Sequence, residues 1–226
     1  MSAPEIKATF PLLLSLNGGY VDTAGFLALS GLFTAHVTGN FVTLGASLVL
    51  GTSGAMAKLL ALPVFCVVVI ATRLLSTWLS ERQRPALDTL LVLQVLLLII
   101  GAVLAMQFGP FRNADGWRAV LTGMVLVGAM AIQNAFHRVH LGSAPPSTMM
   151  TGTTTQVMID LADRFYAPPG PDAQPSSRIL RMSTTIAIFA TGCGAAALLY
   201  RLFGVKCFVV PPIVGILQFL VRPTAR

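Results

Sequence analysis

Residues 90–106 read LLVLQVLLLIIGAVLAM, seventeen residues with one polar side chain and no charge. A helix needs about 20 mostly apolar residues to cross the hydrocarbon core of a bilayer, so the segment from Leu90 to Gln107 predicts a transmembrane helix. The rest of the chain has a similar character, because 55% of its 226 residues are hydrophobic and only 10% are charged. A soluble domain carries roughly 25% charged residues. We therefore expect lipid to surround most of the exterior.

Apolar segments of this length recur along the chain. They predict an all-α fold, a polytopic transmembrane helix bundle in which residues 1–226 form a single integral membrane domain. Residues 167–177 are rich in Pro and Gly, which predicts an exposed loop. The six expected spans cover residues 9–33, 58–79, 90–107, 117–136, 179–200 and 207–221.

Two shorter segments, 34–50 and 147–165, are rich in Thr and Gly and begin with a polar break. Each of them either spans the bilayer or re-enters it, and non-helical backbone at membrane depth requires a protein or water-filled surrounding. With re-entry, 10 Lys and Arg residues lie on the side of the N-terminus and 5 on the other; with spanning, the division is 9 against 6. The positive-inside rule favours six spans with both termini in the cytoplasm.

The two halves of the chain resemble each other. HVTGN at 36–40 has a counterpart in MMTGT at 149–153, and the two glycines are 113 residues apart, half of the chain length. Upstream, YVD at 20–22 matches IQN at 132–134 within one residue. A chance match of two Thr-Gly pairs is the alternative. With three spans in each half, the second copy would enter the membrane upside down, as in many secondary transporters. The expected inverted repeats are 9–107 and 117–221, each with a short broken or re-entrant helix.

Asp22 lies midway along the first apolar segment, with Asn17 five residues before it. An ionisable group at the bilayer centre costs about 2.5–3.5 kcal/mol, so Asp22 must be paired, protonated or exposed to a wet cavity. It is either a proton or cation site or a hydrogen-bonding residue that holds helices together. Gly18 and Gly19 permit close approach of another helix.

The Thr-Gly segments are candidate binding elements. A half-helix N-terminus offers free N–H groups to an anion or a polar solute, although Thr and Asn are also common N-caps. Gln133 and Asn134 either line the same cavity as Asp22 or mark a helix interface. His36 is either a group that titrates near neutral pH or a hydrogen-bonding residue at the membrane interface. The candidate site residues are Asn17, Asp22, His36, Thr38, Asn40, Gln133, Asn134, Thr151 and Thr153.

Other classes of site find no support in the sequence. His137 and His140 lack a third metal ligand, and the three cysteines show no Cys-x-x-Cys spacing, so we expect no metal and no cofactor. Motifs of catalytic nucleophiles, phosphate-binding loops and dinucleotide sites are missing, which indicates that the protein is not an enzyme. The net charge of +7 is scattered between apolar runs and predicts no nucleic-acid partner. Ala187, Thr191 and Ala195 recur every four residues and predict a close-packed helix face.

The stretch GYVDTAGFL at 19–27, followed by FTAHVTGN at 33–40, resembles the YoaK-like family of small bacterial inner-membrane proteins. Chain length, span pattern and the later Thr-Gly motif also fit that family. The resemblance implies a multi-pass protein of the bacterial inner membrane, but it supplies no substrate or reaction.

The function expected from these residues is a transporter or permease for a small polar solute or ion, with a proton as the coupling partner at Asp22. Its site would lie between the two repeats. The alternatives are a membrane-embedded binding or assembly protein whose polar residues only join helices, and an intramembrane enzyme. Beyond the lipid bilayer and such a solute, the sequence names no partner, and the oligomeric state stays open.

Overall fold

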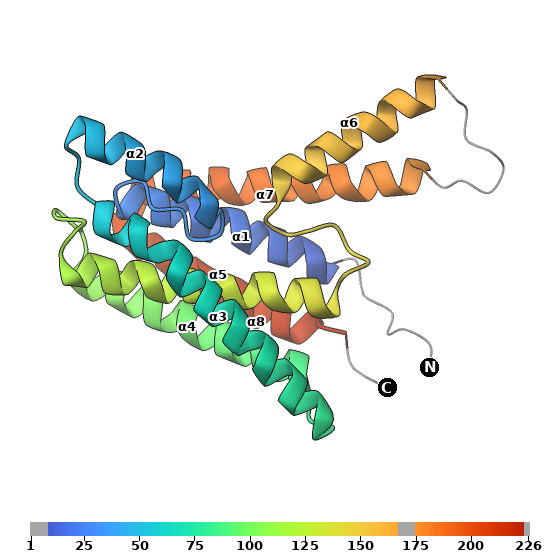
Figure 1. The fold of residues 1–226 in the computed structure, drawn as a ribbon, viewed down its shortest axis with the longest axis horizontal. Coiled ribbons are helices and arrows are strands. Elements are labelled where there is room, and N and C mark those ends of the chain that lie inside the picture. Colours follow the sequence, from blue (N-terminus) through green and yellow to red (C-terminus); the bar gives the residue numbers. More distant parts are fainter. Residues whose placement is uncertain (1–8, 167–174, 224–226) are drawn as a thin grey trace.

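A computed structural model describes residues 9–166 and 175–223, and every regular element in these ranges is helical. The all-α prediction is confirmed. Figure 1 shows a bundle of helices with α2 and α6, the helices that follow the two Thr-Gly segments, along one side. The helices are α1 (Thr9–Ala28), α2 (Asn40–Leu50), α3 (Ala55–Glu81), α4 (Ala86–Phe108), α5 (Trp117–His140), α6 (Met150–Tyr166), α7 (Pro175–Phe203) and α8 (Val210–Val221), with 3-10 turns η1 (Val37–Gly39) and η2 (Gly204–Val209).

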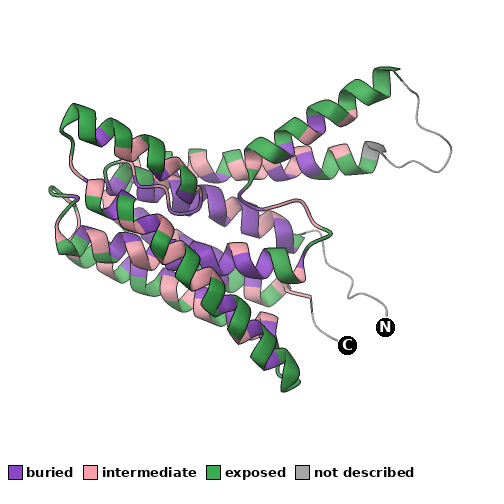
Figure 2. Ribbon diagram, in the orientation of Figure 1, coloured by how far each residue is buried: buried purple, intermediate pink, exposed green. Residues whose placement is uncertain are grey.

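Four helical stretches in the described residues are long and apolar enough to cross a membrane: α3, α4, α5 and the 45-residue stretch Ser177–Val221. The last contains α7 and α8, and Figure 1 shows the chain reversing between them. Their outward faces are apolar, as at Val67, Ile70 and Leu74 of α3, which are 66%, 60% and 65% exposed. Exposed and buried residues lie on opposite sides of these helices in Figure 2, as expected for a bundle in lipid.

Helix α1 is the central helix, and its composition follows from that position. It is not among the four candidate spans, yet 13 of its 20 residues are buried. It packs against α5, α7 and α8, which separate its polar residues from lipid. The helix ends at Ala28, before the predicted end at residue 33, and the chain turns at Ser30 and Gly31, both with positive φ.

Both connections that precede the short helices fold back along the helix they leave. Thr34 returns to bond Asp22, six residues before the end of α1, and Thr148 returns to bond Asn134, six residues before the end of α5. Each connection therefore returns along about 9 Å of the helix it leaves, the length of six helical residues. In Figure 1, α2 and α6 then run outward to opposite ends of the bundle. The 11 residues of α2 extend only about 16 Å, too short for a bilayer core of about 30 Å, which favours re-entry over spanning.

Most helix contacts follow one pattern in both halves, with the contact of α3 with α4 as an exception. α1 packs against α7 as α5 packs against α3, and α1 packs against α8 as α5 packs against α4. α2 lies on α3 as α6 lies on α7, and α4 meets α8 directly. Exchanging α1–α4 for α5–α8 leaves this set of contacts unchanged.

Two sequence predictions differ from the structure. Residues 167–174 of the expected loop lie outside the described residues, but Pro175 already begins α7, since proline is tolerated in the first turn of a helix. The expected packing face of α7 is wrong: Thr191 is exposed, whereas its neighbour Gly192 is buried. A Cβ at Gly192 would lie 2.2 Å from the carbonyl oxygen of Leu16, so α1 approaches α7 on the glycine side.

Candidate functional site

The carboxylate of Asp22 holds the returning connection against α1. Its Oδ1 accepts hydrogen bonds from the backbone N–H groups of Thr34 and Ala35, both at 2.7 Å, and from the Thr34 hydroxyl at 3.3 Å. Its Oδ2 lies 2.7 Å from Nδ1 of His36. Asp22 is 5% exposed, and a buried carboxylate requires such partners. The turn at Ser30 and Gly31 brings the donors back to it.

His36 connects this carboxylate to a cavity. The cavity has a volume of about 440 Å³ and is lined by residues of α1, of the returning connection and of α7. One ring nitrogen of His36 faces Asp22, and the backbone of Thr148 also lies beside the ring. The ring meets Phe189 of α7 edge to face, with centroids 5.4 Å apart. The lining residues are Asp22, Thr23, Phe26, Leu27, Phe33, His36, Gly39, Phe189 and Cys193.

The equivalent place in the second half is also held by hydrogen bonds within the chain. Oδ1 of Asn134 accepts a hydrogen bond from the Thr148 hydroxyl at 2.5 Å, while its Nδ2 donates to the carbonyl of Met130 at 2.9 Å. Gln133 is completely buried; its Nε2 donates to the Leu14 carbonyl and to Ser147, and its Oε1 accepts from Gln94. Gln133 therefore joins α1, α4, α5 and the connection before α6 in a hydrogen-bonded interior.

The remaining candidates lie at separate places. Asn40 bonds the backbone of Phe33 twice, at 2.9 and 2.8 Å, and so closes the returning connection. Thr153 is buried and donates to the carbonyl of Met149, whereas Thr38 is exposed. Asn17 is completely buried, and neither amide atom has a hydrogen-bond partner in the described residues.

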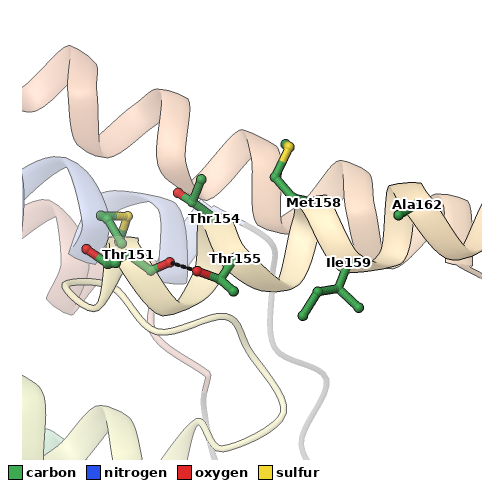
Figure 3. Close-up of a pocket in the computed structure, with 7 residues that line it drawn as sticks. Thr151, Thr154, Thr155, Met158, Ile159 and Ala162 are labelled. Carbon is green, nitrogen blue, oxygen red and sulfur yellow. Dashed lines mark hydrogen bonds between the residues drawn. The ribbon is translucent and has the colours of Figure 1, made fainter.

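Thr151 lines a different hollow. That hollow measures about 660 Å³ and lies along one face of α6, as Figure 3 shows. It shares no lining residue with the His36 cavity. Gly39 and Thr151, one from each Thr-Gly dipeptide, thus line different hollows. The two halves meet instead through the connections that precede these dipeptides, where the backbone of Thr148 lies beside His36.

Asp22, His36, Gly39 and the backbone of Thr148 converge, with Asn134 bonded to Thr148 behind them. Sequence reasoning missed Thr148, Phe189 and Cys193. The sequence could have indicated Thr148, because this residue stands 113 positions after Ala35, the same spacing that relates the two Thr-Gly motifs. Phe189 and Cys193 carry no such signal. No group of three metal-ligating side chains occurs in the described part of the chain.

Comparison with known proteins agrees with this fold. Residues 10–221 match a family described as "Protein of unknown function (DUF1275)". The chain belongs to the DUF1275 family. A curated DUF1275 relative, the UPF0700 transmembrane protein YoaK of Bacillus subtilis (strain 168), is 31% identical over 174 residues, which cover 74% of this chain and 72% of the relative. The expected YoaK-like resemblance is confirmed. No solved structure matches this DUF1275 chain.

Membership in DUF1275 and the apolar helices show an integral, multi-pass membrane protein. Within that frame, the His36 cavity offers an apolar wall, three aromatic rings and one carboxylate–imidazole pair. Such a pair fixes the orientation of the imidazole, a group that can take up and release a proton.

Proposed function

We propose that this DUF1275 protein is a proton-coupled permease, in which a small solute binds beside His36 in the cavity between α1 and α7. The observation that carries the proposal is the Asp22–His36 pair on the wall of that cavity, at the place where the backbone of the second half also arrives. Ionisable residues inside a membrane domain mark ion and substrate pathways by default.

His36 is the proton carrier in this mechanism. Asp22 accepts the Nδ1 proton, which leaves Nε2 to take up and release a proton. Among the described residues that line the cavity, α1 contributes Asp22 as a charged group, and α7 contributes the neutral Phe189 and Cys193. Protonation turns the Asp22–His36 pair from net negative to neutral.

The cavity wall narrows the class of solute. Phe26, Leu27, Phe33 and Phe189 present carbon, and the polar atoms of Asp22 are occupied by its donors. A solute with a small apolar body and one polar or anionic group fits this wall better than the polar solute expected from sequence. The polar group would receive a hydrogen bond from protonated His36.

Movement between the two halves would give access from alternate sides. The helix pairing that repeats between α1–α4 and α5–α8, together with the two re-entrant connections, supports an inverted repeat. In transporters of this type one repeat rocks against the other around a central site. The proposal involves no catalytic step, and the positive-inside rule supports a topology with both termini on the cytoplasmic side of a bacterial inner membrane.

A second candidate function is a membrane-embedded binding or assembly protein. It is favoured by Gln133 and Asn40, whose hydrogen bonds all go to other parts of the same chain. In that case the polar residues stabilise the bundle, and the cavity does not exchange solute across the membrane.

The test is solute-dependent proton movement in liposomes that contain the purified protein and an internal pH dye. A panel of short-chain carboxylates and amines is added under an imposed pH gradient. We expect one class to move protons and His36→Gln to abolish that movement while Tm in detergent changes little. His140→Gln is the matched control, since His140 bonds Ser76 between α5 and α3 and lines no described cavity.

Two results would contradict the permease. One is a panel in which no solute moves protons faster than in empty liposomes. The other is a His36→Gln protein that transports as well as His140→Gln does. Either result leaves the binding or assembly protein as the function.

A further inference from the structure

A second cavity lies on the other side of Thr148 from the His36 site. It is small, about 40 Å³, and lies between the last turns of α5 and the connection that leads to α6. Its rim carries the exposed residues Arg138 and Gly142, and its interior is formed by Asn134, His137 and Ser147. The volume suffices for one or two water molecules, since a site needs at least 10–15 Å³ for one.

The two cavities are lined by corresponding positions of the two halves. Asp22, Phe26 and His36 line the large cavity, and the residues 112 or 113 positions later, Asn134, Arg138 and Met149, line the small one. α1 and α5, which line the large and the small cavity respectively, run in opposite directions in Figure 1.

The ring of His137 makes no hydrogen bond of regular geometry in the described residues, although the backbone of Ala144 and Pro145 lies beside it. The His137 side chain lines the small cavity, and the residue is 6% exposed. Leaving a buried polar group unpaired costs about 1–3 kcal/mol. A water molecule in the small cavity would give the ring a hydrogen-bond partner, and Asn134 and Ser147 supply further polar atoms around the same space.

Thr148 forms the partition between the two cavities. Its hydroxyl donates to Asn134, which lines the small cavity, and its backbone lies beside the ring of His36, which lines the large one. A Cβ at Gly18 would lie 3.1 Å from Cγ2 of Thr148, so α1 closes the partition on its remaining side.

We infer that the small cavity at His137 is a water-binding access site for protons, which reaches the His36 site from the opposite membrane face once the Thr148–Asn134 hydrogen bond opens. The inference rests on the proposed function for its purpose, because a proton carrier needs access from both sides. The structure then represents a state in which the large cavity is open and the small one is nearly closed.

Thiol accessibility tests the two openings without any solute. The first protein retains only Cys193, with Cys66→Ala and Cys207→Ala; the second also carries Cys193→Ala and has Ala144→Cys at the small cavity. A charged, membrane-impermeant methanethiosulfonate is applied to either face of oriented vesicles. We expect Cys193 to react from one face and the cysteine at position 144 to react from the other. Reaction of both from the same face, or no reaction at position 144, overturns the inference.

Proton leak tests the partition. Thr148→Val removes the hydroxyl that bonds Asn134, and we expect proton leak through liposomes to rise several-fold without added solute. Thr155→Val is the control, since Thr155 bonds only the carbonyl of Thr151 within exposed α6. A Thr148→Val protein that leaks no faster than this control removes the partition from the mechanism. Thiol accessibility and proton leak are both measured without a transported solute, so both tests remain valid even if no solute of the panel is moved.

Discussion

Nδ1 of His36 lies 2.7 Å from Oδ2 of Asp22, 14 positions earlier in the chain, because the connection that leaves α1 returns to it. This contact joins the most buried helix of the bundle to the wall of its 440 Å³ cavity. Asp22 therefore has two separable roles. Its Oδ1 accepts the backbone N–H groups of the returning connection, and its Oδ2 orients the imidazole ring of His36.

Asp22→Ala should destabilise the protein strongly. The change leaves the buried N–H groups of Thr34 and Ala35 without an acceptor, for which we expect a loss of about 3 kcal/mol in the free energy of unfolding. Asp22→Asn retains one amide oxygen as acceptor and should lose less. Thermal unfolding in detergent measures both, with Asp163→Asn on exposed α6 as the control. Equal melting temperatures for Asp22→Ala and this control would show that the returning connection is held by other contacts.

The amide pair Gln94 and Gln133 should behave as one structural unit. Gln133→Leu leaves Gln94, Ser147 and the Leu14 carbonyl unpaired in a completely buried place, which should cost about 2 kcal/mol. The double change Gln94→Leu and Gln133→Leu should cost less than the sum of the single changes, because it removes both partners of one bond. Additive effects in a double-mutant cycle would contradict this coupling.

Two glycines set the spacing of α1 and α7. A Cβ at Gly19 would lie 2.2 Å from the carbonyl oxygen of Phe189, and one at Gly192 equally close to that of Leu16. Either Gly→Ala change should separate the helices and lower the melting temperature by many degrees. Gly194→Ala is the matched control, since nothing lies within 4 Å of its Cβ. It should be neutral or stabilising by up to about 1 kcal/mol; an equal loss in all three proteins would contradict the close approach.

Asp115 should make stability depend on pH outside the membrane. In the connection between α4 and α5 its carboxylate accepts the backbone N–H groups of Gly54 and Met56 at the start of α3, and these bonds hold its pKa below the usual value. The stabilisation, about 1 kcal/mol for a helix cap, is present above the ordinary pKa of about 3.9 and is lost as pH falls through the lowered one.

Melting temperatures of the wild-type protein and Asp115→Ala, compared from pH 7 down to pH 3, measure this contribution. The difference between the two proteins should be constant near neutral pH and shrink at the acid end. A difference that grows with acidification would assign the opposite sign to the effect.

Much of the bundle follows from composition alone. Segments 58–79, 90–107 and 117–136 each lie within one helix, because a long apolar run in lipid has to satisfy its backbone internally and therefore forms a helix. Asp22 stood out for a related reason, since a charge within such a run needs a partner. The fold class and the central position of this residue could thus be predicted.

The hydrogen-bond partners of the polar residues could not be predicted from the sequence. Asn40 and Gln133 have the same polarity in the sequence, yet one closes a turn and the other joins four elements. The face of α7 that meets α1 also differs from the predicted one, because Gly192 rather than Thr191 permits the approach.

Local sequence thus determined which segments are helical and which of their residues are costly to bury, since both depend on short-range properties of the chain. Tertiary structure alone decided that the connection before α2 returns to Asp22, and that Thr148 arrives beside His36 from the other half. These contacts join residues far apart in the chain, so their free energy depends on how the helices pack, which no single segment encodes.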